Sequence, residues 1–218
     1  FCDRHLGRMA RLKLLTPVVS GIYAGDPEQL GAESSFPAMV DLEREHGSLV
    51  RAAIKGNGPP KRGRLQTFDD GLQSLAAHVT DRLGESYQPG TMVQGLARHG
   101  EGWQVELSNG ELRTASAVVL AIPAQAAADL LEGLHPELAG ELNAVPYAPM
   151  AVVHIGVRRE DAGKLPDTFG FLVPRDEGLR ILGAIFSSRL FEGRAPAGHE
   201  LVTVFTGGAL DPESIELQ

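Results

Sequence analysis

The side chains of this chain that could ligate a metal or act in catalysis are its histidines, its carboxylates and its single cysteine. A metal site needs His, Cys or carboxylate ligands at close spacing, yet the seven histidines are scattered. They are His5, His46, His78, His99, His135, His154 and His199. Cys2 is the only cysteine, and neither a G-x-S-x-G nucleophile motif nor a Walker loop occurs. Asp69 and Asp70 precede an expected helix, so helix capping is the favoured interpretation and acid–base chemistry the alternative.

The composition is typical of a globular protein. Of 218 residues, 43% are hydrophobic and 22% are charged. A formal net charge of -8 argues against a nucleic-acid partner, because a phosphate backbone requires clustered Lys and Arg. One cysteine allows no internal disulfide, which favours a reducing compartment. No apolar run approaches the roughly 18 residues of a membrane span.

The first zone of the chain, residues 3–56, is predicted to be helical, because apolar residues recur there at helical spacing. Pro17 is expected to end or kink the first helix. Gly21, Gly25 and Pro27 then predict a tight turn. The basic stretch Lys55–Arg64 is predicted to be a solvated loop, with contact to an anionic substrate or membrane surface as the alternative.

The second zone mixes helices and strands. Its expected elements are a short strand at 65–68, a helix at 71–83, strands at 91–96, 103–107 and 112–114, and helices at 123–131 and 136–144. Asn109-Gly110 predicts a two-residue type I′ hairpin turn. The continuous apolar run Ala117–Ile122 predicts a strand buried on both faces of a parallel sheet. In the third zone, strands at 151–157, 170–173, 181–186 and 201–205 predict an antiparallel meander.

Seven segments, taken in order, resemble the protoporphyrinogen oxidases, which are flavin enzymes of the amine-oxidase-like superfamily. These segments are Ser20–Leu30, Phe36–Ser48, Thr67–Leu75, Val118–Ala124, Tyr147–His154, Phe169–Pro174 and Thr203–Ala209. Their order and spacing carry the resemblance. Asp70 departs from it, since the family pattern has a glycine there. Because the family's G-x-G-x-x-G turn is absent, we expect the chain to be the middle part of such an enzyme.

The resemblance implies a mixed α/β (α+β) fold, the middle part of an amine-oxidase-like FAD-binding fold. Residues 1–63 would be the helical part of the substrate- or membrane-binding region. Residues 64–135 would be the central segment of the FAD-binding domain. Residues 136–218 would be the β-sheet part of the substrate-binding domain.

The resemblance also implies a set of binding residues. Val93 matches a valine that contacts FAD through its backbone, and Ala121 matches a small residue beside the cofactor. Leu172 and Ile185 would sandwich a pyrrole ring of a tetrapyrrole substrate, with Phe205 stacked on another ring. The turn from Gly21 to Ala24 would pass close to the substrate edge. By residue type alone, core packing is the favoured interpretation of the apolar members.

The implied function is FAD-dependent oxidation of protoporphyrinogen IX to protoporphyrin IX with O2 as acceptor, in haem biosynthesis. The alternatives are a coproporphyrinogen III oxidase of the same family and a non-catalytic binding or interaction fragment. The expected location is the cytoplasm, either free or peripherally on the inner face of the cell membrane. A homodimer and a peripheral membrane contact are compatible with this interpretation.

Overall fold

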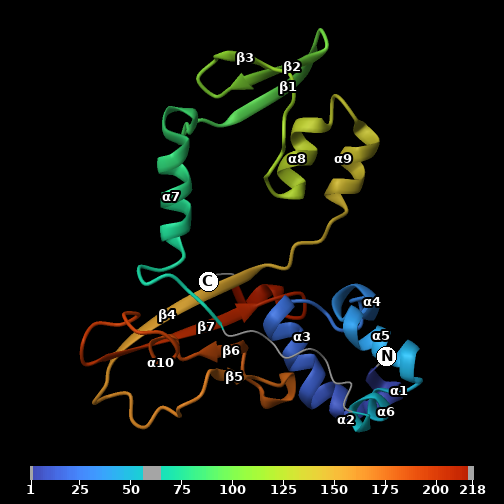
Figure 1. Cartoon of the computed structure of the whole chain (residues 1–218), viewed down its shortest axis with the longest axis vertical. Coiled ribbons are helices and arrows are strands. Elements are labelled where there is room, and N and C mark those ends of the chain that lie inside the picture. Colours follow the sequence, from blue (N-terminus) through green and yellow to red (C-terminus); the bar gives the residue numbers. More distant parts are fainter. Residues whose placement is uncertain (1, 56–64, 216–218) are drawn as a thin grey trace. The chain divides into compact units, whose positions relative to one another are not determined.

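The computed structural model describes residues 2–55 and 65–215. The chain divides into two compact units, Phe1–Leu72 with Ala148–Gln218, and Gln73–Tyr147 (Figure 1). The domain boundary predicted after residue 135 falls between α8 (Ala124–Leu131) and α9 (Pro136–Asn143), two helices of the second unit. The predicted basic loop Lys55–Arg64 lies outside the described residues except for Lys55.

The N-terminal part of the first unit is helical, as predicted. Its helices are α1 (Cys2–Leu6), α2 (Arg8–Ala10), α3 (Thr16–Tyr23), α4 (Ala32–Ser35), α5 (Pro37–His46) and α6 (Leu49–Ile54). A π-helical turn, Arg11–Leu15, joins α2 to α3. Pro17 does not end the helix, which continues to Tyr23. Proline lacks an N–H donor, and the wider π-helical turn immediately before it takes up this local distortion.

Because α3 continues to Tyr23, the turn begins later in the chain than predicted. Gly21 lies inside the helix, and the chain leaves the helix only at Ala24, which has a left-handed backbone with φ of 53°. The Ala24 carbonyl accepts a hydrogen bond from the Ala209 amide at 2.7 Å. The turn therefore begins three residues later than the glycine pattern predicted.

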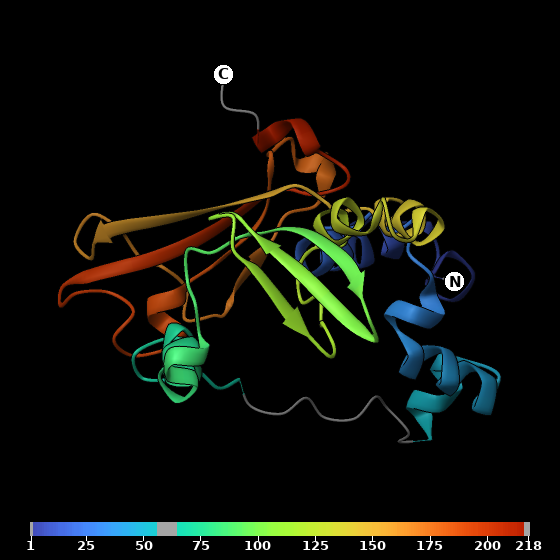
Figure 2. The ribbon, with the colours of Figure 1, turned by 90° about the horizontal axis from the view of Figure 1, so that it is seen from above.

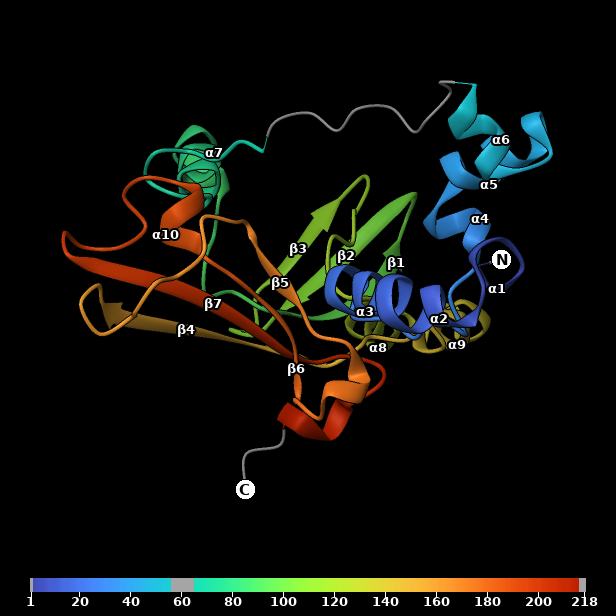
Figure 3. The same ribbon diagram turned by 90° about the horizontal axis from the view of Figure 1, so that it is seen from below.

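The second part of the first unit is a four-stranded antiparallel sheet. Its strands are β4 (Met150–Arg158), β5 (Gly170–Leu172), β6 (Ile181–Ile185) and β7 (His199–Gly207), in the order β4-β7-β6-β5. The antiparallel prediction is confirmed, but the meander is wrong, because β4 pairs with β7 in a Greek-key order. Figure 3 shows α3 beside β5 and β6, which it contacts.

The predicted strand at 65–68 is wrong. This segment is irregular and pairs with no strand among the described residues. Arg194 instead donates hydrogen bonds to the Thr67 hydroxyl and the Phe68 carbonyl, at 2.9 and 2.8 Å. Asp69 and Asp70 lie in the following turn, and α7 begins only at Gln73, so neither stands directly before the helix.

The second unit contains a three-stranded antiparallel sheet and three helices. The elements are α7 (Gln73–Leu83), β1 (Val93–His99), β2 (Gly102–Leu107), β3 (Leu112–Ala115), α8 (Ala124–Leu131) and α9 (Pro136–Asn143). Helices α8 and α9 lie side by side (Figure 2) around buried Ala128, Leu131 and Ala139. This agrees with the predicted helices and hairpin strands.

Two local predictions in the second unit are wrong. The Leu107 amide donates to the Glu111 carbonyl, and this pair closes a three-residue loop between β2 and β3. Within the loop the Gly110 amide donates to the Leu107 carbonyl, and only Gly110 has positive φ. This is a type I turn followed by a left-handed glycine. Residues 117–122 form no strand, and Val119 is 88% exposed. A strand needs a hydrogen-bonded neighbour, and in the described part of the chain β1, β2 and β3 pair only with one another.

Short 3₁₀ turns complete the described chain at Gly84–Ser86, Arg175–Glu177 and Pro212–Ile215. No helix within the described ranges is both long and apolar enough to cross a bilayer.

Candidate functional site

The first unit contains an apolar cavity of about 820 Å³ where α3 meets the sheet. Its lining includes Gly21, Phe169, Leu172, Gly183, Ile185 and Phe205. Every described residue that lines it is glycine, alanine or a larger apolar residue. The cavity therefore suits a large apolar ligand, since its walls offer no charged or hydroxyl side chain.

The strand register explains why these residues meet. Leu172 on β5 lies opposite Gly183 on β6, and Gly183 lies opposite Phe205 on β7. Residues directly opposite each other in a sheet share a face, so Leu172 and Phe205 flank a glycine that fills no space between them. A Cβ at Gly183 would lie only 2.4 Å from the Phe171 carbonyl oxygen, so no larger residue fits there without a backbone shift.

Helix α3 closes one side of the cavity through Gly21. A Cβ built on Gly21 would lie 2.4 Å from Cδ2 of Leu172. The absent side chain lets the helix backbone approach the strand closely. The position of the Leu172 side chain in the cavity therefore depends on Gly21.

Four of the five predicted substrate residues line this one cavity: Gly21, Leu172, Ile185 and Phe205. Ala24 does not line it and is buried at 6% exposure against Ala209 and Gly208. Sequence reasoning missed Phe169 and Gly183. Phe169 lies within a segment that carried the resemblance, whereas Gly183 could be recognised only from the strand register.

The two predicted cofactor residues also share a cavity, in the second unit. Val93 and Ala121 both line a space of about 700 Å³, together with Met92, Val118 and Asp129 among others. It is bounded by the start of β1, the irregular stretch before α8, and α8 itself.

The backbone of Val93 is available to a ligand. In the register Val93 lies opposite Leu107, but Leu107 donates its amide to Glu111. Val93 and Leu107 therefore form a non-hydrogen-bonded pair, whose amides point away from each other. Since β1 is the edge strand of the described sheet, the Val93 N–H points to its open edge.

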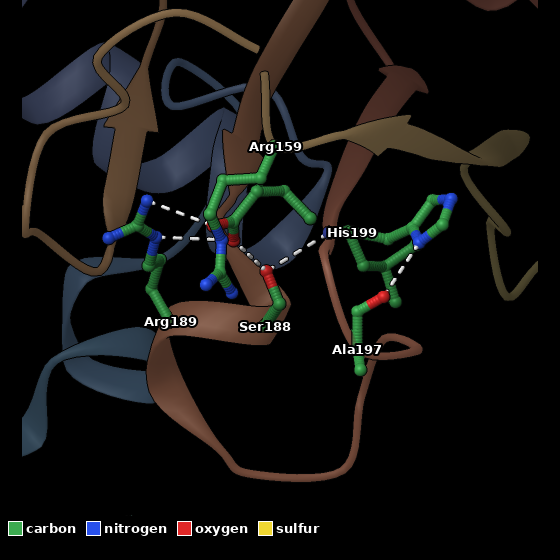
Figure 4. Close-up of polar contacts among 7 residues, drawn as sticks. Arg159, Ser188, Arg189, Ala197 and His199 are labelled. Carbon is green, nitrogen blue, oxygen red and sulfur yellow. Dashed lines mark hydrogen bonds and ion pairs between the residues drawn. The ribbon is translucent and has the colours of Figure 1, made fainter. Parts of the chain in front are cut away.

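A buried carboxylate at the start of β7 lies outside both cavities. Glu200 is 1% exposed and accepts hydrogen bonds from Ser188 at 2.6 Å, Arg159 at 2.9 Å and Arg189 at 3.2 Å (Figure 4). The Ser188 hydrogen bond, followed by the two arginines, lowers the pKa of Glu200. This network ties α10 (Ser187–Leu190) to β7, and we assign it a structural role.

Within residues 2–55 and 65–215, no group of three or more His, Cys, Asp or Glu side chains could hold a metal ion. The two cavities described above supply space for binding and orienting large ligands.

Comparison with known proteins now defines the class. The family model described as flavin containing amine oxidoreductase matches residues 1–216, and the chain belongs to this family. A flavin, FAD, is the cofactor that the family uses. The chain thus belongs to a family of flavin oxidoreductases.

Individual proteins of the family are similar to this chain in sequence. The chain is 32% identical to protoporphyrinogen oxidase 1, chloroplastic, of Spinacia oleracea, over 97% of this chain and 42% of the relative. It is 30% identical to human protoporphyrinogen oxidase, over 96% and 47%. It is 29% identical to coproporphyrinogen III oxidase of Bacillus subtilis (strain 168), over 100% and 48%. The chain spans less than half the length of each of these relatives.

Solved structures share the fold. A protein of Exiguobacterium sp. 255-15, described provisionally as a protoporphyrinogen oxidase, matches with a TM-score of 0.78 at 24% identity. The match covers 93% of this chain and 43% of that one. A putrescine oxidase variant matches 69% of this chain and 32% of that one, with a TM-score of 0.55 at 13% identity. The predicted amine-oxidase-like fold is confirmed.

The cavity of the second unit fits part of a flavin. Its walls are mostly apolar, with Thr91, Gln94 and Asp129 as the polar members, and would suit an aromatic ring system with a polar edge. The outward N–H of Val93 would offer a donor to a polar atom of such a group. Ala121, which is exposed, presents only a methyl group there, so a ligand can approach the backbone closely.

Proposed function

We propose that a protein containing this chain oxidises protoporphyrinogen IX to protoporphyrin IX with O2 as the final acceptor. Loss of six electrons and six hydrogens from the substrate reduces three O2 molecules to three hydrogen peroxide molecules. The observation that carries the proposal is the apolar cavity of the first unit, with Leu172, Ile185 and Phe205 from three adjacent strands.

The family resemblance implies a role for each of these residues, and their shared cavity supports it. Leu172 and Ile185 provide flat aliphatic contact for a pyrrole ring, and Phe205 provides an aromatic face on which a second ring stacks. Gly21 sets the position of Leu172. Together they hold the macrocycle in one orientation and exclude water from it.

Bound FAD supplies the hydride acceptor. The residues of the second unit would hold it: the Val93 amide would donate a hydrogen bond, and Ala121 would leave space beside the backbone. No acid–base side chain of this chain is assigned to the reaction, because the described lining of the substrate cavity has none.

The second candidate substrate is coproporphyrinogen III, which the likeness to the Bacillus subtilis relative favours. It carries four propionates where protoporphyrinogen IX carries two. Burying two further carboxylates would be costly in a cavity that offers no cation or hydrogen-bond donor side chain among its described lining residues. The apolar lining therefore favours protoporphyrinogen IX, the substrate with fewer charges, over coproporphyrinogen III.

The test is a comparison of kcat/KM for the two porphyrinogens with the full-length protein, followed by porphyrin fluorescence. We expect protoporphyrinogen IX to be preferred by at least tenfold, about 1.4 kcal/mol. A reversed preference would replace the proposed substrate with coproporphyrinogen III, and equal values would refute the preference derived from the cavity. A cytoplasmic location, peripheral membrane contact and a homodimer stay predictions, as does the alternative of a non-catalytic fragment.

A further inference from the structure

The turn that borders the cofactor cavity leads directly into helix α8. Residues Val118–Ile122 line the cavity, and α8 begins at Ala124 after Pro123. Residues 117–122 have no strand partner in the described part of the chain, and Val119 is largely exposed. The position of this stretch therefore depends on where its C-terminal end is anchored.

The start of α8 has no cap of its own. Pro123 stands at the N-cap position and makes no side-chain hydrogen bond to the helix. The first amides of a helix have no partner within it, and a side-chain oxygen normally accepts one of them. The Pro123 carbonyl accepts the first hydrogen bond within the helix, from the Ala127 amide at 3.0 Å, so the amides of Ala124 to Ala126 have no acceptor within the helix.

A residue more than twenty positions later supplies the missing acceptor. The hydroxyl oxygen of Tyr147 accepts a hydrogen bond from the Ala124 amide at 3.0 Å. One residue further along the helix, Gln125 donates from Nε2 to the Val145 carbonyl at 2.8 Å. The segment after α9 is thus tied at two points to the first turn of α8.

The helix that receives these ties is itself well packed. Ala128 and Leu131 of α8 are buried against Ala139 of α9. The two hydrogen bonds therefore connect a fixed helix pair to the end of the cavity-lining stretch.

We propose that Tyr147 is a positioning residue for the cofactor: as an external cap of α8, it fixes the Ala121–Pro123 turn against which FAD binds. This inference rests on the proposed function only in placing FAD in the cavity of Val93 and Ala121. It assigns Tyr147 no contact with the substrate and no part in the chemistry.

The test uses Tyr147→Phe in the full-length protein, because this change keeps the ring and removes the acceptor. Loss of one hydrogen bond that positions the turn should raise the FAD dissociation constant about three- to tenfold. It should also shift the visible absorption band of the bound flavin, since the turn borders the cofactor. Tyr87→Phe is the matched control, because Tyr87 is an exposed tyrosine of the same unit, 47% exposed against 57% for Tyr147.

A second variant tests the tie independently. Gln125→Glu replaces the donor opposite the Val145 carbonyl with a carboxylate and should weaken FAD binding in the same direction. Melting of the apoprotein separates positioning from general destabilisation. An unchanged FAD dissociation constant and flavin spectrum in Tyr147→Phe would overturn the inference, as would equal changes in the Tyr87→Phe control. Failure of the wild-type protein to bind FAD would refute the proposed function instead.

Discussion

Replacing Gly21 with alanine adds one carbon atom beside the substrate cavity and tests whether the position of Leu172 matters for substrate binding. The added Cβ would lie 2.4 Å from Cδ2 of Leu172, whereas ordinary van der Waals contact begins at 3.4 Å. Leu172 must therefore move by about 1 Å. The contact atom is the end of a flexible side chain that is 40% exposed, so the side chain can yield without unfolding the sheet.

Gly21→Ala should affect catalysis more than stability. Gly21 lies inside α3, where alanine is favoured over glycine by about 1 kcal/mol, which offsets part of the clash. The displaced Leu172 narrows the cavity, and we expect kcat/KM for protoporphyrinogen IX to fall about tenfold, or about 1.4 kcal/mol. FAD content should be unchanged, because Gly21 and the cofactor cavity belong to different units.

The assay combines steady-state kinetics with thermal melting of the full-length protein. Gly140→Ala is the matched control: Gly140 is also helical, in α9, and a Cβ there meets nothing within 4 Å. The Leu172→Ala background provides a double-mutant cycle, in which Gly21→Ala should lose most of its effect. Normal kinetics in Gly21→Ala, or an undiminished effect without Leu172, would refute the assignment of the cavity.

Three further changes test other parts of the account. Phe205→Ala should lower kcat/KM about tenfold to a hundredfold with FAD retained; a melting loss equivalent to about 3–5 kcal/mol with normal kinetics would instead make Phe205 a core residue. Val93→Pro should release FAD while Val93→Ala retains it, because the outward amide is removed and proline is tolerated on an edge strand; equal FAD loss from both would contradict the backbone contact. Glu200 has a lowered pKa, so its stabilisation is present above its unfolded pKa of about 4.3 and is lost as the pH falls through the folded value. Glu200→Gln should therefore melt lower at neutral pH and show a flatter decline below about pH 5, and parallel curves for the two proteins would exclude this role.

Local patterns predicted most of the elements but not their partners. Apolar spacing located helices in both units, and alternation located β4. Short apolar runs located β5 and β6. The run Ala117–Ile122 was predicted as a buried strand from its composition alone. Strand formation also requires neighbouring strands with free edges, and a single run of residues carries no information about them.

The binding residues were predicted by resemblance and brought together by register. Leu, Ile and Phe in strands are ordinary core residues by type, so periodicity could not single out Leu172, Ile185 or Phe205. Leu172 and Phe205 converge because both pair with Gly183, and Ile185 lies two residues further along β6 on the same face. Ala24 shows the opposite case, because its left-handed backbone and its hydrogen bond to Ala209 depend on a segment far away in the sequence.

The most direct test of the central claim is anaerobic mixing of the full-length protein with protoporphyrinogen IX, monitored by flavin absorption. The account predicts that the oxidised flavin band disappears on mixing, that protoporphyrin appears in step with it, and that admission of O2 restores the band. A protein that carries no flavin would contradict the account. So would a bound flavin that stays oxidised with protoporphyrinogen IX while coproporphyrinogen III reduces it.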